Sequence, residues 1–203
     1  MTTLCRGTVV LASASTARAA LLEQAGLEVV REPAGVDEAA VKASFRQEGF
    51  DAASCATALA EAKATRVSER HRDALVIGAD QILVHDERWL DKPRDRTEAR
   101  AQLADLRGSR HELVTGVVVA KNGATLWRHS DRAFLYMRAF SDEFLAAYLD
   151  TVGDAVLASV GAYQLEGVGA QLFARIEGDY FSILGLPLLP LLEFLREHGV
   201  VPR

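Results

Sequence analysis

Cysteine is scarce in this chain, which has only Cys5 and Cys55 among its 203 residues. These two residues are neither spaced like zinc ligands nor numerous enough for a disulfide framework. Disulfides persist in oxidising compartments and are rare in the cytosol. The scarcity of cysteine therefore predicts a protein of the cytoplasm.

Long hydrophobic runs are also missing. The most apolar tract, Ile183 to Leu192, contains two prolines and is shorter than the roughly 18 residues that a membrane-spanning helix needs. Near the N-terminus, Arg6 and the apolar run Val9 to Ala12 imitate the start of a signal peptide. That run is shorter than the roughly 7 residues of a signal-peptide core. We expect neither a membrane span nor a signal peptide.

Positive charge is outnumbered by negative charge. The chain has 23 Lys and Arg against 28 Asp and Glu, with a formal net charge of -5. Proteins that bind nucleic acids through the phosphate backbone rely on many basic residues. The balance argues against a nucleic-acid partner but allows a small anion in a local basic pocket. Hydrophobic residues make up 49% of the chain, enough for one sizeable core, so a single domain spanning residues 1–203 is predicted.

Strands and helices alternate in the first part of the sequence, and a hairpin follows. Asn122-Gly123 joins two runs of alternating hydrophobicity, which is a strong hairpin signal. Ser54 and Thr97 are the expected caps of two helices, and Gly78 is expected to stop the third strand. The pattern predicts strands at 8–12, 28–31, 74–77, 111–120, 125–137 and 172–176, and helices at 15–26, 39–47 and 55–69 and after Thr97, Ser141 and Leu186. The predicted fold class is α/β with a mixed sheet.

The first strand runs directly into a hydroxyl-rich turn, Ser13 to Thr16, and then into a helix with Ser13 or Ser15 as its cap. The free N–H groups of a helix start can bind a phosphate. Arg18 falls in the first helical turn, where the helix dipole disfavours a cation by about 0.3 to 1 kcal/mol unless an anion is bound there. The segment is either a phosphate cradle or a plain capped helix with an exposed Arg18.

In the segment Val76 to Pro93, an acidic residue follows a buried strand and a basic residue lies where the chain returns. Asp80 follows a short apolar run, and an unpaired carboxylate is costly to bury. Pro93 restricts Lys92 to an extended conformation. Lys92 is therefore not expected to join a helix, and its ammonium group is held in one direction. The pair indicates phosphate or metal chemistry. The alternative is a strand end followed by a solvated lysine in a loop.

Further charged residues are predicted on helices. Lys63 falls on the apolar stripe of the helix at 55–69 and so faces the protein, where it either extends to solvent or binds an anion. Asp37 and Glu38 begin the helix at 39–47, where acids usually interact with the helix dipole and metal ligation is the alternative. His111, in the hairpin, is interpreted as structural. The glycine-rich tract Gly153 to Gly169 has the backbone freedom to wrap around a ligand.

Several short motifs recur in one order along nearly the whole chain. They are Leu11-Ala12-Ser13-Ala14-Ser15 with Arg18, Val36-Asp37-Glu38, Leu59-Ala60 with Lys63-Ala64, Gly78-Ala79-Asp80, Lys92-Pro93, Gly108 with His111 and Thr115-Gly116, Gly161-Ala162-Tyr163, and Gly185-Leu186-Pro187-Leu188. No single motif is decisive, but their order and spacing together are specific. In these motifs the chain resembles the Maf family of nucleotide pyrophosphatases.

The resemblance implies a Maf / ITPase-like fold, with a twisted, mixed central sheet and flanking helices in two lobes around a long cleft. It implies a homodimer that hydrolyses nucleoside triphosphates to monophosphate and pyrophosphate with a divalent cation, Mg²⁺ or Mn²⁺. By the same resemblance, Asp80 is a general base or metal-linked carboxylate, and Glu38 is a metal ligand. Catalysis would involve Lys63 and Lys92 together with Asp80. The phosphates would be held by Lys63, Lys92, Arg18 and Ser13.

The chain departs from the family at positions associated with substrate choice. Many members have Ser-Pro-Arg-Arg where this chain has Ser15-Thr16-Ala17-Arg18, so Ala17 replaces the first arginine. Gln81 and Glu166 resemble the subgroup that acts on 7-methylguanosine triphosphate, although that subgroup has a bulky aromatic residue at the place of Ala17. Carboxylate oxygens of Glu166 can accept from the ring N–H and the amino group of guanine, but carbonyl groups of uracil and thymine would repel them.

The predicted function is metal-dependent hydrolysis of modified or non-standard nucleoside triphosphates, with a guanine-type base such as that of 7-methyl-GTP. The alternative is a non-catalytic nucleotide-binding regulator of cell division and septum formation, a role also attached to the family. A nucleic-acid-binding module is a third alternative, and the acidic charge balance disfavours it.

Overall fold

The computed structural model describes residues 7–203, so Cys5 and Arg6 lie outside the described residues. The strands are β1 (Thr8–Leu11), β2 (Glu28–Arg31), β3 (Leu75–His85), β4 (Arg88–Leu90), β5 (Arg110–Lys121), β6 (Ala124–Met137) and β7 (Phe173–Glu177). The α-helices are α1 (Thr16–Gln24), α2 (Glu38–Gln47), α3 (Ala52–Ser68), α4 (Arg96–Leu106), α5 (Asp142–Val152), α6 (Tyr180–Ile183) and α7 (Leu188–Glu197). Three 3₁₀ helices, η1 (Gly153–Ala158), η2 (Val160–Ala162) and η3 (Val168–Leu172), occupy the glycine-rich tract.

The strands form one seven-stranded sheet in the order β2-β1-β3-β5-β6-β7, with β4 paired to β3. β1 is parallel to β2 and β3, whereas β4 is antiparallel to β3 and β7 is antiparallel to β6. The predicted α/β fold with a mixed sheet is therefore confirmed. No helix within residues 7–203 has the length and apolar character to cross a membrane.

The chain divides into two compact units. The first contains the residues up to Asp80, Thr115–Asp131 and Gly185–Arg203, and the second contains Gln81–Val114 and Arg132–Leu184. The predicted single domain and the long cleft between two lobes stay predictions.

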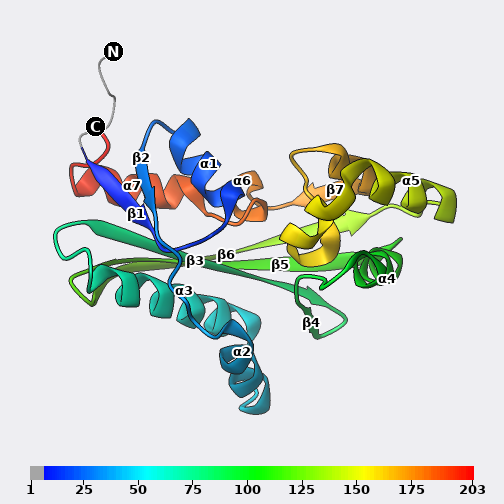
Figure 1. Ribbon diagram of the computed structural model, residues 1–203, viewed down its shortest axis with the longest axis horizontal. Helices are drawn as coiled ribbons and strands as arrows, with labels where there is room; N and C mark the ends of the chain where they lie inside the picture. Colours follow the sequence, from blue (N-terminus) through cyan, green and yellow to red (C-terminus); the bar gives the residue numbers. More distant parts are fainter. Residues whose placement is uncertain (1–6) are drawn as a thin grey trace. The chain divides into compact units, whose positions relative to one another are not determined.

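In the first unit, α3 lies along β3 and β5, and α2 lies next to one end of α3 (Figure 1). The helix face against the sheet is made of alanines, because the backbones approach very closely there. A Cβ atom on Gly78 would lie 2.1 Å from the Ala60 carbonyl oxygen, and one on Gly116 would lie 2.7 Å from the Ala56 carbonyl carbon. Ala60 and Ala64 pack with Val118 and Ala120 in this layer. Small residues on both surfaces thus allow contact between helix and strand backbones.

In the second unit, α4 and α5 contribute to the largest apolar cluster of the described residues. Leu103 and Leu106 of α4 and Leu145 of α5 pack with Leu83 and Leu135 from the strands, and all five are fully buried. The 3₁₀ segments also contribute residues to this cluster, such as Val156 and Leu172.

Three local predictions were wrong. Gly78 does not stop a strand, since β3 continues through it to His85 and Asp80 therefore lies within the strand. Asp51, and not Ser54, caps α3, and Asp95, and not Thr97, caps α4. In both helices the aspartate lies earlier in the chain than the predicted residue, and its side chain accepts a hydrogen bond from the first turn. A carboxylate there also interacts favourably with the helix dipole.

Candidate active site

Lys63 lies between two carboxylates in the first unit. Its Nζ atom is 2.6 Å from Asp80 Oδ1 and 2.5 Å from Glu38 Oε1. The side chains of Lys63 and Asp80 are only 9% and 6% exposed, whereas that of Glu38 is 45% exposed. The three residues therefore form a charged group with a buried end at Asp80 and a solvent-accessible end at Glu38.

The close approach of α3 to β3 brings Lys63 to Asp80. Asp80 comes two residues after Gly78 and lies on the same face of the strand. Lys63 comes three residues after Ala60 and lies on the same side of the helix. The helix touches the strand at Ala60 and Gly78. The ammonium and carboxylate are consequently held together by two packed backbones. The prediction that Lys63 faces the protein is confirmed, since the residue is 7% exposed.

Glu38 reaches this group from the first turn of α2. Asp37 is the cap of that helix, with Oδ1 accepting a hydrogen bond from the Ala40 N–H at 3.0 Å. Burial alone would raise the pKa of Glu38, but the charge and hydrogen bond of Lys63 and the charges of Lys42 and Arg18 lower it overall. Asp37 therefore interacts with its own helix, whereas Glu38, whose pKa is lowered, is held against Lys63.

Asp80 has one oxygen without a protein partner. Its Oδ2 atom is buried and makes no hydrogen bond with the described residues. Mg²⁺ is usually bound by one or two carboxylates together with phosphate oxygens of a substrate. Asp80 Oδ2 and the carboxylate of Glu38 fit such a donor set. No group of three or more His, Cys, Asp or Glu side chains among residues 7–203 could hold a metal ion, so these two carboxylates would need oxygens from a ligand.

A serine-rich turn precedes α1 in the same unit. Ser15 is the cap of the helix, and its Oγ accepts a hydrogen bond from the Arg18 N–H at 3.3 Å. Ser13 is 8% exposed, and its Oγ accepts from the Ser15 N–H at 3.1 Å and from Arg18 Nη1 at 3.3 Å. The alternative caps predicted for this helix are thereby resolved in favour of Ser15, and Ser13 is instead joined to Arg18.

Arg18 connects three parts of the first unit. Its Nε donates to the Gly185 carbonyl at 2.7 Å and its Nη1 donates to the Ala79 carbonyl at 2.8 Å. Gly185 has a φ of +99°, and a Cβ atom there would lie 3.2 Å from Arg18 Nε. Burial lowers the pKa of Arg18, while the charges of Asp80 and Glu38 oppose that effect. The interpretation of this segment as a plain capped helix with an exposed Arg18 is therefore wrong. The Arg18 guanidinium instead donates a hydrogen bond to the strand residue directly before Asp80.

Of the other predicted site residues, Ala17 belongs to the first unit, and Gln81, Lys92 and Glu166 belong to the second. Ala17 lies partly buried in the first turn of α1. Gln81 belongs to the second unit, where its Nε2 donates to the carbonyls of Ser182 at 2.9 Å and Ile183 at 3.2 Å. Lys92 and Glu166, also of the second unit, are exposed. That Gln81, Lys92 and Glu166 act at the same ligand as Asp80 stays a prediction.

Lys42 was missed by the sequence analysis. It lies in α2, is 6% exposed, and its charge lowers the pKa of the Glu38 carboxyl. The sequence could have indicated that Lys42 lies near Glu38, because it follows Glu38 by four residues in a predicted helix and so shares its face.

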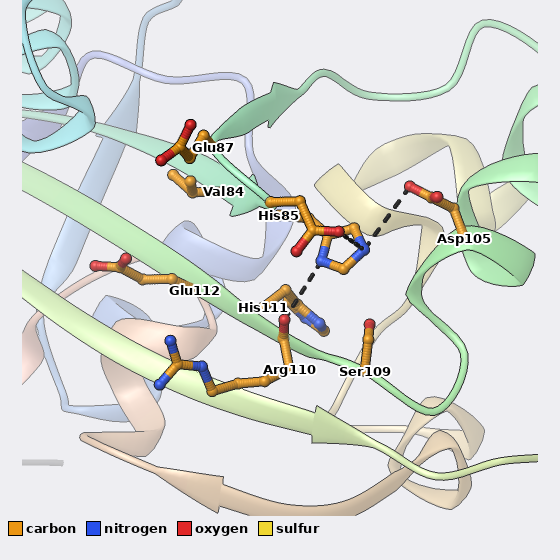
Figure 2. A pocket seen from close by; sticks show the side chains of 9 residues that line it. Val84, His85, Glu87, Asp105, Ser109, Arg110, His111 and Glu112 are labelled. Carbon is orange, nitrogen blue, oxygen red and sulfur yellow. Dashed lines mark hydrogen bonds and ion pairs between the residues drawn. The ribbon is translucent and has the colours of Figure 1, made fainter.

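The second unit contains a cavity of about 640 Å³ lined by His85, Asp105, Arg110 and His111 among others (Figure 2). His111 is 2% exposed, and its Nε2 is 2.7 Å from the hydroxyl of Tyr163. Burial, aided by the charge of His85, lowers the pKa of His111 to about 3. A histidine that stays neutral and bonds a buried tyrosine fits the structural interpretation of His111.

These observations define a class: an α/β protein in which a helix, a strand and a serine-rich turn bring a lysine, an arginine and two carboxylates together in one charged cluster. The chain belongs to the Maf-like protein family, whose model matches residues 8–198. It is 58% identical over 190 residues to a protein of Granulibacter bethesdensis named nucleoside triphosphate pyrophosphatase, with 94% of this chain and 96% of the relative covered. A protein of Paramagnetospirillum magneticum with the same name is 57% identical, with 93% and 97% covered. A Rhizobium meliloti protein named 7-methyl-GTP pyrophosphatase is 49% identical, with 95% and 97% covered.

Proposed function

We propose that this protein is an enzyme that hydrolyses nucleoside triphosphates to nucleoside monophosphate and pyrophosphate. The observation that carries the proposal is the bridge formed by Lys63 between Glu38 and Asp80, with Asp80 Oδ2 buried and without a partner among the described residues. Membership of the Maf-like family and the names of the relatives support the same activity.

In the proposed reaction, a water oxygen forms a new bond to the α-phosphorus. The bond from that phosphorus to the oxygen bridging the α- and β-phosphates breaks, and pyrophosphate leaves with that oxygen. Asp80 accepts the proton of the attacking water or binds the metal. Lys63, Arg18 and Ser13 hold phosphate oxygens of a substrate that carries about four negative charges. Each well-placed donor of this kind contributes about 3 to 4 kcal/mol of transition-state stabilisation.

Glu38 and Asp80 are the residues that would hold a divalent cation, Mg²⁺ or Mn²⁺. Such a cation would act as a Lewis acid on the phosphoryl oxygens and neutralise part of their charge. The unpartnered Oδ2 of Asp80 and the half-exposed side chain of Glu38 support this assignment. Lys92, from the second unit, would be a further phosphate-binding residue.

A guanine-type base, such as that of 7-methyl-GTP, is the proposed specificity. Glu166 would accept hydrogen bonds from the base, with Gln81 and Ala17 shaping the same subsite. Exposure of Glu166 leaves its carboxylate available to a ligand, and Gln81 is oriented by two backbone carbonyls. We also propose that the protein is a homodimer of single-domain chains in the cytoplasm, and light scattering would measure its mass in solution.

The test is a panel of nucleoside triphosphates, 7-methyl-GTP included, incubated with the protein and either Mg²⁺ or Mn²⁺. Release of pyrophosphate, with the D80N variant inactive but folded, is the expected result. A wild-type protein that released no pyrophosphate from any member of the panel would overturn the proposal. The alternative of a non-catalytic regulator of cell division predicts that D80N keeps the cellular effect of the wild type.

A further inference from the structure

The segment that carries Lys92 is fastened on both sides to one face of α4. Gln102 Nε2 donates a hydrogen bond at 2.9 Å to the carbonyl of Asp91, directly before Lys92. Glu98 Oε2 accepts hydrogen bonds at 2.9 Å from both the backbone N–H and the Nε of Arg94, two residues after Lys92. Gln102 follows Glu98 by four residues in α4, so the two side chains share a face of that helix. One helix face therefore holds the backbone before and after Lys92.

The connection between β4 and α4 is restrained in a further way, by Pro93. This residue is buried, while Lys92 and Arg94 on either side of it are exposed. Its ring fixes its own φ angle and restricts Lys92 to extended conformations. A loop that binds a ligand normally loses backbone freedom, at a cost in free energy. For the backbone of Lys92, much of that cost is met within the protein before any ligand binds.

Gln102 has one polar atom without a partner. Its Oε1 is buried and makes no hydrogen bond with the described residues. Burying an unpaired oxygen costs free energy, which a leucine of similar size would avoid. What the glutamine has and a leucine lacks is the N–H donor to Asp91. Stability alone therefore does not account for Gln102, whereas fixing the chain beside Lys92 does.

We propose that Gln102 and Glu98 are positioning residues for Lys92. They fix the backbone on both sides of it, so that the lysine side chain starts from a fixed point when it binds a phosphate. The inference rests on the proposed function, in which Lys92 binds a phosphate of the substrate. In this role neither Gln102 nor Glu98 touches the substrate or transfers a proton. Removing either side chain should therefore affect the reaction only through Lys92.

The experiment is a double-mutant cycle that compares kcat/KM of the wild type, Q102L, K92M and Q102L/K92M for the panel nucleotide that the wild type hydrolyses fastest. K92M should lose about 100-fold or more, as expected when a donor to the reacting group is removed. Q102L should lose about 10-fold, because misplacement by about 1 Å can reduce a rate by about 100-fold and a loosened loop displaces Lys92 by less. The double variant should match K92M within about 2-fold, since Gln102 then has nothing to position.

Stability and a second variant separate positioning from a structural role. Q102L should melt no lower than the wild type, because it removes a buried unpaired oxygen. E98L should lose about as much kcat/KM as Q102L, whereas E98Q keeps an oxygen that accepts from the Arg94 N–H and should retain most of the activity. The matched control is Q24L, which removes the exposed amide of Gln24 at the end of α1 and should change neither activity nor melting temperature.

Three results would overturn the inference. Losses that multiply in Q102L/K92M would show that Gln102 acts on the fold and not through Lys92. K92M with wild-type activity would leave nothing to position, although the proposed function would stand. Failure of both Q102L and E98L to fold would make the two residues structural. The proposed function fails separately, if the wild type hydrolyses no nucleotide, and the same cycle measured as affinity for inorganic tripolyphosphate in calorimetry then decides the inference.

Discussion

Replacing Gly78 with alanine tests whether backbone contact between α3 and β3 positions the site. The new Cβ atom would lie 2.1 Å from the Ala60 carbonyl oxygen and 2.8 Å from the Ala64 backbone nitrogen. Non-bonded heavy atoms are stable at about 3.5 Å or more, so helix and strand must separate by roughly 1 Å or more. Both clashing atoms are backbone atoms of a long helix, so no side-chain rotation relieves them.

The separation should cost both stability and activity. Overpacking a core usually costs about 1 to 3 kcal/mol, and a clash with helix backbone belongs at or above the top of that range. The same shift would move Lys63 away from Asp80, where the present distance is 2.6 Å. Misplacement of a catalytic group by about 1 Å can reduce a rate by about 100-fold. We expect G78A to lose at least about 3 kcal/mol of unfolding free energy and most of its kcat/KM.

Urea unfolding followed by circular dichroism, together with pyrophosphate release, measures the two effects of G78A. The matched control is G7A, because a Cβ on Gly7 would meet only Val200 side-chain atoms at 3.8 Å, an ordinary contact. G7A should stay within about 0.5 kcal/mol of the wild type. If G78A were as stable and as active as G7A, the close approach of α3 would not be what holds the site.

Three further predictions concern the charged residues. K63M should lose about 3 to 5 kcal/mol of unfolding free energy at pH 7, measured by urea titration, because it leaves the buried Asp80 without a compensating charge. D80N should lose less, because Lys63 keeps its contact with Glu38. Equal losses in the two variants would contradict this reasoning. The pKa of folded Glu38 is lowered from its ordinary 4.5, so its stabilisation is present above that pH and is lost as the pH falls through the lowered value. E38Q should therefore lose less stability than the wild type upon acidification, and parallel curves would show that Glu38 contributes nothing. E166Q should shift the ratio of kcat/KM values from guanine towards uracil triphosphates by about 10-fold or more, and an unchanged ratio would mean that Glu166 does not contact the base.

The strands of the sheet and the burial of Lys63 in the site follow from local sequence patterns. Asn122-Gly123 predicted a hairpin, and both residues have positive φ angles, of 50° and 78°. The position of Lys63 on the alanine-rich stripe predicted that it would be buried, because the periodicity of a helix fixes which side chains share a face. Glu38 and Asp80 could be named as acids, but their distance to Lys63 depends on how α2 and β3 pack against α3, which no local pattern contains.

The wrong predictions have different physical causes. Gly78 was interpreted as a strand stop because glycine weakens strands locally, but here it allows a helix backbone to lie against the strand, and that tertiary contact outweighs the local preference. Ser54 does not cap α3 because Asp51, an equally suitable capping residue, lies a turn earlier and begins the helix there. Lys42 escaped notice because its burial depends on what covers α2 and not on its neighbours in sequence.

Lys63 links the stability of the protein to its proposed reaction. In the structure described here its ammonium is held by two carboxylates, and without them a buried cation would be destabilising by several kcal/mol. If those same carboxylates held a divalent cation, as proposed, they would neutralise Lys63 to a lesser extent. Lys63 would then need another anion, which a polyphosphate would provide. Metal binding without substrate should therefore be disfavoured, and substrate and metal should favour each other, because a single buried charge is shared between both partners.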